Sequence, residues 1–250
     1  MKAMILAAGL GTRLRPLTDD RPKALVEVAG RTLLEITLSR LRSFGIREVI
    51  VNVHHFADMM LDYLEANRNF GMQIEISREE TLLDTGGGLK KAAYFFLEDS
   101  STREEPFILH NVDVLSTIDL DRMVRLHNQH QALATLAVQD RVTSRYLLFD
   151  SQLQLCGRRS SRDQEPEVVG SSQPAQALAF CGIHVISPRL LTRMEGDVFS
   201  IITSYLQLAA QGEKIQAFRA DEYYWRDLGK LDAVRQATQE VAVWSSSVLS

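Results

Sequence analysis

Short apolar runs alternate with amphipathic stretches in the first half of the chain. Residues 3–8, "AMILAA", form a continuous apolar run that ends at a glycine, which is typical of a strand buried on both faces. Residues 32–45 have Thr32 and Glu35 at capping-box spacing and Gly45 as a stop, which predicts a helix. The same patterns predict strands at 47–53, 72–77 and 106–113 and helices at 56–71 and 89–99, the last one fed by a "GGG" turn. Strands and helices that alternate with short connections give a parallel sheet with right-handed crossovers, so we expect an α/β fold with a Rossmann-like mixed, mostly parallel sheet flanked by helices.

The second half of the chain is less regular. Its patterns predict helices at 120–130, 199–212 and 230–244, strands at 132–139, 177–187, 214–220 and 223–228, and a hairpin followed by a polar loop at 145–167. We expect the segment 157–176 to be a mobile loop and residues 245–250 to be a frayed tail. Since 250 residues suffice for one large core, residues 1–244 are predicted to form a single domain.

Charge and composition exclude several classes of function. A net charge of −4 argues against nonspecific binding to nucleic acid or to an anionic membrane, because both need a basic face. Cys156 and Cys181 have neither metal-ligand spacing nor the density of a disulfide framework. No secretory signal or membrane-spanning run is visible, so we expect a cytoplasmic protein, as a monomer or homodimer, that holds any anionic ligand with a few local cations.

The glycine-rich loop after the first strand is the first candidate site. Gly9 and Gly11 lack the third glycine and the following helix of a dinucleotide site, and no Lys–Ser/Thr pair follows as in a P-loop. The backbone N–H groups of residues 9–12 can approach an anion closely, and Arg13, Arg15 and Lys23 add positive charge. This composition suits a polyphosphate, although a turn with ordinary surface cations would look the same.

Two prolines follow the glycine-rich loop. Pro16 comes shortly after Arg15, and Pro22 directly precedes Lys23. Because proline stiffens the backbone, we expect the chain to continue in an extended path that returns Lys23 to the loop.

Two acidic residues at strand ends form the second candidate site. Asp113 follows the strand "PFILH", and Asp227 follows the short strand "YYWR". Ligand sites of open α/β sheets gather at such ends, and Mg²⁺ takes few protein carboxylates beside water and phosphate oxygens. The pair therefore predicts a Mg²⁺ site, with loop or helix capping as the alternative for either residue alone.

Taken together, these segments resemble the sugar-1-phosphate nucleotidylyltransferase family. The similar motifs occur in the family's order from residue 2 to about residue 235: "LAAGLGTRLRPLT", "LDTGGGLKKA", "NVD", "FCGIHVISPRLL" and "WRDLG". The branch that they most resemble contains N-acetylmuramate-1-phosphate uridylyltransferases and mannose-1-phosphate guanylyltransferases.

The resemblance implies a reaction in which a sugar-1-phosphate oxygen attacks the α-phosphorus of an NTP and releases pyrophosphate. Such a transfer needs positioning and charge neutralisation rather than a nucleophilic side chain. The implied substrates are UTP with N-acetylmuramate 1-phosphate or GTP with mannose 1-phosphate. The first pair would place the reaction in cell-wall synthesis. The implied nucleotide-binding half is N-terminal and the sugar-binding half C-terminal.

The resemblance also implies roles for individual residues. Those expected to bind the nucleotide are Ala7, Ala8, Gly9, Gly11, Thr12, Arg13, Lys23, Thr85, Gly86 and Gly87. Those expected to face the sugar are Asp84, Gly88, Asn111 and Gly182. Arg13, Lys23, Asp113 and Asp227 are the expected catalytic residues, and Asp113 and Asp227 the Mg²⁺ ligands.

The sequence departs from the family's motifs at several positions, among them Val112 in "NVD", and two alternative functions remain. Lys230 replaces a common threonine after the second metal motif, and the hairpin that presents a phosphate-binding cation in many relatives offers Arg158 or Arg159 here. The same fold could serve a catalytically silent nucleotide-binding or sugar-nucleotide-binding regulator. A cytidylyltransferase that acts on phosphocholine would share the loop.

Overall fold

The computed structural model describes residues 1–98, 104–160, 165–170 and 173–243. These residues form two compact units, each assembled from separate stretches of the chain. The first unit holds residues 1–83, 109–118 and the described residues from 224 onward, and the second holds those of 84–108 and 119–223. The prediction that 1–244 is a single domain stays a prediction, and the predicted tail 245–250 lies outside the described residues.

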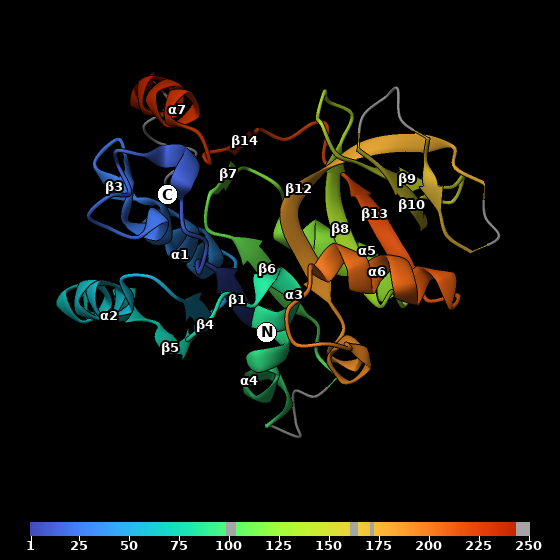
Figure 1. Ribbon diagram of the computed structural model, residues 1–250, viewed down its shortest axis with the longest axis horizontal. Helices are drawn as coiled ribbons and strands as arrows, with labels where there is room; N and C mark the ends of the chain where they lie inside the picture. The colour runs from blue at the N-terminus through green and yellow to red at the C-terminus, as the bar shows by residue number, and fades with distance from the viewer. Residues whose placement is uncertain (99–103, 161–164, 171–172, 244–250) are drawn as a thin grey trace. The chain divides into compact units, whose positions relative to one another are not determined.

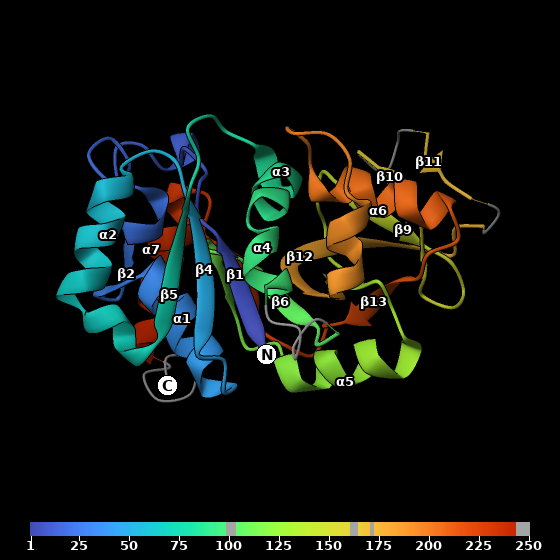
Figure 2. The same ribbon diagram turned by 90° about the horizontal axis from the view of Figure 1, so that it is seen from below.

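Parallel strands form the centre of the first unit. Strand β1 (Lys2–Leu6) pairs in parallel with β4 (Glu48–Val53), and β4 pairs in parallel with β5 (Gln73–Arg78). Figure 2 shows these three strands next to one another. Since the register pairs Leu6 with Asn52 and Asn52 with Ser77, the three strands end at one edge, as the alternating pattern predicted.

The helices of the first unit follow their sequence signals. Helix α1 (Leu33–Ser43) begins where the Thr32 side chain accepts a hydrogen bond from the Glu35 N–H, which confirms the predicted cap. Helix α2 is Ala57–Ala66 and α7 is Leu231–Val243. Short elements complete the unit: 3₁₀ turns Thr12–Leu14, Lys23–Leu25 and Arg68–Gly71, strands β2 (Glu27–Val28) and β3 (Arg31–Thr32), and strands β7 (Val114–Ser116) and β14 (Trp225–Asp227).

The end of the described chain packs against its beginning within the first unit. Helix α7 contacts both β2 and β14, and Figure 1 shows it beside the blue N-terminal segment. Strand β14 pairs antiparallel with β7, which brings Asp227 opposite Val114. The segments that carry Asp113 and Asp227 therefore lie side by side although they are far apart in sequence.

The second unit contains a mixed sheet. Strand β12 (Gln176–Ile186) pairs antiparallel with β8 (Ala134–Gln139) and β9 (Tyr146–Phe149), and β8 pairs in parallel with β13 (Ile215–Arg219). The predicted hairpin is confirmed, because β9 pairs antiparallel with β10 (Leu155–Arg159). The predicted loop 157–176 is wrong in part, because β10 extends into it and pairs with β11 (Glu167–Val168); its residues 161–164 and 171–172 lie outside the described residues.

The described residues of the second unit also form four α-helices. They are α3 (Asp84–Lys91), α4 (Ala93–Leu97), α5 (Leu120–His130) and α6 (Ile201–Ala210), with a 3₁₀ helix at Pro188–Arg193. Helix α5 packs on β8, β12 and β13, α6 contacts β10 and α3, and Figure 2 shows β13 between α5 and α6. Strand β6 (Phe107–Asn111) runs across the boundary between the units.

The predicted fold class is confirmed. Mixed β-structure is flanked by helices, with parallel pairing among β1, β4 and β5 and both kinds of pairing in the sheet of the second unit. Among the described residues, no helix combines the length and the apolar character that crossing a bilayer requires.

Candidate active site

The glycine-rich loop leaves β1 at the sheet edge and folds back on itself. Gly11 has φ 66°, and its carbonyl accepts hydrogen bonds from the Leu14 N–H at 2.8 Å and the Thr18 hydroxyl at 2.9 Å. A Cβ at Gly11 would lie 2.9 Å from Thr18 Cγ2 and 3.2 Å from Lys23 Cβ, so glycine is required by both backbone and space. Buried Leu14 anchors the turn, and Thr12 and Arg13 remain exposed.

Lys23 and Asp113 form an ion pair beside this loop. The Lys23 ammonium donates a hydrogen bond to Asp113 Oδ2, and the two side chains are 13% and 15% exposed. Pro22 is buried and extended, with ψ 151°, directly before Lys23. The structure therefore joins two of the four predicted catalytic residues, across 90 positions of sequence, in a partly buried ion pair.

Asp227 and Arg13 converge on the same place around Gly229. The Leu228 N–H donates to the Asp113 carbonyl at 2.8 Å, and the Gly229 N–H donates to Asp227 Oδ1 at 2.6 Å. A Cβ built on Gly229 would lie 2.7 Å from Asp227 Oδ1, 3.0 Å from Arg13 Nη2 and 3.3 Å from Asp113 Oδ2. Two carboxylates and one guanidinium thus surround the Cα of Gly229 so closely that a side chain at this position would collide with them. The other predicted residues of this unit lie at the start of the glycine-rich loop, in the loop, or at the end of β6: Ala7, Ala8, Gly9, Thr12 and Asn111.

This arrangement fits a divalent cation held mainly by its substrate. The described residues contain no group of three or more His, Cys, Asp or Glu side chains that could hold a metal ion. At phosphate-transfer sites Mg²⁺ is nevertheless held by one or two carboxylates together with phosphate oxygens and water. One oxygen of each carboxylate, Asp227 Oδ1 and Asp113 Oδ2, lies within 3.3 Å of the Cβ position built on Gly229.

A buried polar network at the same sheet edge was missed by the sequence analysis. Asn52 Oδ1 accepts from the Ala7 N–H at 2.7 Å, and Asn52 Nδ2 donates to Glu79 Oε1 at 2.7 Å. Glu79 Oε2 accepts from the Leu83 N–H at 3.1 Å. Asn52 is 3% and Glu79 2% exposed. The available signal was Asn52, a polar residue inside the apolar run "VIVNV".

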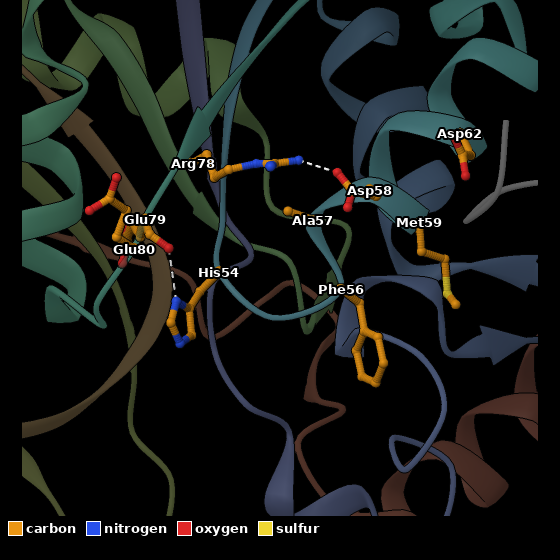
Figure 3. Close-up of a pocket in the computed structure, with 9 residues that line it drawn as sticks. All are labelled: His54, Phe56, Ala57, Asp58, Met59, Asp62, Arg78, Glu79 and Glu80. Carbon is orange, nitrogen blue, oxygen red and sulfur yellow. Dashed lines mark hydrogen bonds and ion pairs between the residues drawn. The ribbon is translucent and has the colours of Figure 1, made fainter.

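A pocket of about 660 Å³ lies beside this network, between the end of β4 and the start of α2. Its lining residues are His54, Phe56, Ala57, Asp58, Met59, Asp62, Arg78, Glu79 and Glu80. Figure 3 shows the His54 ring turned toward the Glu79 backbone, where Nδ1 lies 2.8 Å from the carbonyl oxygen, and Arg78 directed at Asp58. The first contact ties the segment after β4 to the segment after β5, and the second ties the end of β5 to α2.

His110 is unsuited to acid–base work on a substrate. Its ring is fully buried, Nδ1 donates to the Asn111 carbonyl at 2.8 Å, and Nε2 is buried without a hydrogen-bond partner among the described residues. Burial lowers the pKa of His110 to about 4, so the ring is neutral at pH 7. We assign it a structural role within β6.

The remaining predicted residues lie in the second unit. The "GGG" segment is not the predicted turn, because α3 begins at Asp84 and Gly86, Gly87 and Gly88 are buried helical residues. The N–H groups of Gly86 and Gly87 donate to the Phe199 carbonyl at 2.9 and 3.3 Å, and a Cβ on Gly86 would lie 2.3 Å from the Phe199 ring. The glycines thus allow this helix to pack closely on the residues before α6.

Three further predicted residues of the second unit have defined local roles. Thr85 Oγ1 accepts from the Ile201 N–H at 3.0 Å, and Asp84 Oδ1 accepts from the Thr85 N–H at 2.6 Å. Gly182 has φ 74° and lies where the pairing of β12 with β8 shifts register. Their nucleotide and sugar roles stay predictions. Arg158 forms an ion pair with Glu167 at 2.6 Å, and the Arg159 guanidinium lies over the Tyr146 ring.

Comparison with known proteins places this geometry in a family. The sequence profile described as Nucleotidyl transferase matches residues 2–148. An N-acetylmuramate alpha-1-phosphate uridylyltransferase from Caulobacter vibrioides is 33% identical over 248 residues, with 96% of each chain covered. A mannose-1-phosphate guanyltransferase beta-B from Xenopus laevis is 30% identical over 92% of this chain, which spans 61% of that longer protein.

Solved structures show the same fold. A UDP-glucose pyrophosphorylase from Acinetobacter baumanii superposes with a TM-score of 0.77 at 19% identity, covering 99% of this chain and 95% of its own. HddC from Yersinia pseudotuberculosis superposes with a TM-score of 0.76 at 21% identity, covering 96% of this chain and 98% of its own. The resemblance found in the motifs is confirmed: the chain belongs to the nucleotidyl transferase family, and the relatives that it matches are sugar-1-phosphate nucleotidyltransferases.

Proposed function

We propose that this protein transfers a uridylyl group from UTP to N-acetylmuramate 1-phosphate, releasing pyrophosphate and the UDP-sugar. The observation that carries the proposal is the convergence of Arg13, Asp113 and Asp227 around Gly229, beside a glycine-rich loop. The choice of substrate is supported by the uridylyltransferase from Caulobacter vibrioides, which matches over 96% of its length. Mannose 1-phosphate with GTP is the second candidate, supported by guanylyltransferases that this chain matches over 61% of their length.

In this proposal the glycine-rich loop holds the triphosphate. The backbone N–H groups at Gly9, Gly11 and Thr12 face phosphate oxygens, and the absence of side chains at the glycines permits that approach. The exposed Arg13 guanidinium binds phosphate oxygens in a fork and neutralises charge on the departing pyrophosphate. These contacts orient the α-phosphorus for in-line attack by the sugar phosphate oxygen.

Asp113 and Asp227 would hold Mg²⁺ at the same place. The chemistry that Mg²⁺ would supply there is neutralisation of the negative charge on the phosphate groups. The Lys23 ammonium, paired with Asp113, turns to the phosphates once nucleotide is present and favours the negative charge that develops at the α-phosphorus. The reaction requires no side-chain nucleophile and no residue that removes a proton from a phosphate oxygen.

A substrate panel tests this function. UTP, GTP, CTP and dTTP are each incubated with N-acetylmuramate 1-phosphate, mannose 1-phosphate, glucose 1-phosphate and phosphocholine in the presence of Mg²⁺, and pyrophosphate release is recorded. We expect the fastest release with UTP and N-acetylmuramate 1-phosphate, and mass spectrometry should detect the UDP-sugar.

The panel also separates the alternatives. Release with GTP and mannose 1-phosphate alone would move the assignment to the second candidate, and release with CTP and phosphocholine would replace the sugar phosphate with an amino-alcohol phosphate. Nucleotide binding without release in any combination would favour a silent regulator.

A further inference from the structure

We propose that Glu79 and Asn52 are positioning residues for the glycine-rich loop. Glu79 acts through Asn52, because it fixes the direction in which the side-chain amide of Asn52 faces. The inference rests on the proposed function, because it assigns a task to residues that support the loop. Neither side chain needs to touch the substrate. Their task is to hold the Ala7 N–H, the first backbone donor after β1, in one direction.

The network joins the ends of three neighbouring strands. Ala7 follows β1, Asn52 lies in β4, and Glu79 follows β5. Every polar side-chain atom in the chain of bonds has a partner: the Ala7 N–H donates to Asn52 Oδ1, Asn52 Nδ2 donates to Glu79 Oε1, and Glu79 Oε2 accepts from the Leu83 N–H. All of these bonds are buried or partly buried, where an unmade hydrogen bond costs most.

The direction of the Asn52 amide follows from the donors and acceptors around it. A side-chain amide can rotate to exchange its oxygen and nitrogen, so it carries no fixed polarity by itself. Glu79 presents two oxygen acceptors, one already used by the Leu83 N–H, and therefore requires the NH₂ group of Asn52 on its side. The Asn52 oxygen is then left facing the Ala7 N–H.

The backbone contacts of Glu79 explain why it can serve as a fixed reference. Its N–H donates to the Val53 carbonyl at 2.7 Å, and its carbonyl oxygen lies 2.8 Å from His54 Nδ1. Figure 3 shows that second contact at the wall of the pocket. Because backbone and side chain of Glu79 are both held, the carboxylate cannot follow a rotating amide without losing other bonds.

Two single variants and their combination test the inference. In Glu79→Gln, an NH₂ group replaces one of the two carboxylate oxygens, so any rotamer places two donors face to face somewhere in the network. In Asn52→Asp, an oxygen replaces Nδ2 and faces a Glu79 oxygen. The double variant N52D/E79Q restores every hydrogen bond of the network, with donor and acceptor exchanged between positions 52 and 79. The new amide nitrogen at position 79 donates to the new carboxylate at position 52, and the amide oxygen at position 79 accepts from the Leu83 N–H.

The direct readout is hydrogen exchange at the Ala7 amide, measured by NMR on the full chain. We expect exchange to accelerate by about tenfold or more in each single variant and to return to within about threefold of wild type in the double variant. The same pattern should appear in KM for UTP, with kcat changing less, because the variants disturb the loop that binds nucleotide and not the attacking groups. Rescue of both quantities by the double variant is a result that general destabilisation does not produce.

Thr37→Val serves as the matched control. Thr37 is 2% exposed, and its hydroxyl donates to the Leu33 carbonyl inside α1, away from the strand ends. This variant should lower the thermal midpoint without changing Ala7 exchange or KM for UTP.

Failure of this inference and failure of the proposed function give different results. Unchanged Ala7 exchange in both single variants, or no rescue in the double variant, overturns the positioning role whatever the activity of the protein. Accelerated and rescued exchange in a protein whose wild type shows no pyrophosphate release would retain the positioning role and overturn the function instead.

Discussion

Replacing Gly229 by alanine should damage catalysis while leaving the fold in place. The added Cβ would lie 2.7 Å from Asp227 Oδ1, 3.0 Å from Arg13 Nη2 and 3.3 Å from Asp113 Oδ2. To regain an ordinary separation of about 3.4 Å, the Asp227 oxygen must move by about 0.7 Å and the guanidinium by about 0.4 Å. The 2.6 Å bond from the Gly229 N–H to Asp227 would be disturbed as well.

The size of the effect follows from these displacements. A misplacement of about 1 Å in a catalytic group can cost about a hundredfold in rate. We therefore expect kcat/KM to fall about 30-fold, equivalent to about 2 kcal/mol of transition-state stabilisation. The assay is steady-state pyrophosphate release with saturating Mg²⁺, together with thermal unfolding. Since Gly229 does not have a left-handed φ, alanine should be compatible with the backbone.

Gly45→Ala is the control for loss of stability alone. Gly45 ends α1 with φ 76° and has open space where a Cβ would stand. This variant should lower the free energy of unfolding by about 1 kcal/mol without changing kcat/KM. Wild-type kcat/KM in Gly229→Ala would refute the placement of Arg13 and the two carboxylates around this residue.

Three further predictions concern other parts of the molecule. Gly11→Ala should raise KM for UTP and lower the free energy of unfolding by about 1–3 kcal/mol, because its φ is 66° and a Cβ would lie 2.9 Å from Thr18 Cγ2; steady-state kinetics and urea unfolding measure both. Gly86→Ala should destabilise the second unit through the Phe199 ring, and Gly86→Ala combined with Phe199→Ala should be less destabilised than the sum of the two single variants, as a double-mutant cycle by urea unfolding would show. Burial lowers the pKa of His110 to about 4, so the unfolded state binds a proton more readily than the folded state does. The free energy of unfolding should therefore fall as the pH drops from about 6.5 toward 4, and the contribution of His110 to this fall should be about 3 kcal/mol. His110→Gln should make urea unfolding less dependent on pH over that window, and an unchanged slope would contradict the burial argument.

Local sequence signals predicted most of the regular elements. The Thr32–Glu35 spacing indicated the start of α1 because the cap is formed by residues three positions apart. Alternation in "MQIEIS" likewise indicated β5, because side chains of a strand alternate between its two faces. Strands β2, β3 and β7 are two or three residues long and carry no periodicity, so they were not predicted.

The glycine-rich helix shows where local signals fail. Three consecutive glycines favour a turn by intrinsic propensity. The close approach of Phe199 overrides that preference, since its carbonyl accepts from two glycine N–H groups and its ring occupies the space of a Cβ. A contact across more than 100 positions of sequence is invisible to any short window.

Some residues of the candidate site could be predicted from the sequence and others could not. Arg13, Lys23, Asp113 and Asp227 could be found from the sequence because each lies in a motif whose residue types point to phosphate or metal chemistry. Asn52 and Glu79 could not, because their meaning comes from three strand ends that meet only in the folded protein. The extended path predicted between the prolines is also wrong, since residues 12–18 form tight turns stabilised by the Gly11 carbonyl.

Metal-assisted nucleotidyl transfer by Asp113 and Asp227 is tested by comparing wild type with Asp113→Asn and Asp227→Asn in one assay. Each variant keeps the size of the side chain and removes the charge that would hold Mg²⁺. With UTP, N-acetylmuramate 1-phosphate and Mg²⁺, wild type should release pyrophosphate, while both variants lose turnover by at least about a thousandfold and retain the circular dichroism spectrum of the folded protein. Full activity in either variant would contradict the assignment of the two carboxylates to metal-assisted nucleotidyl transfer.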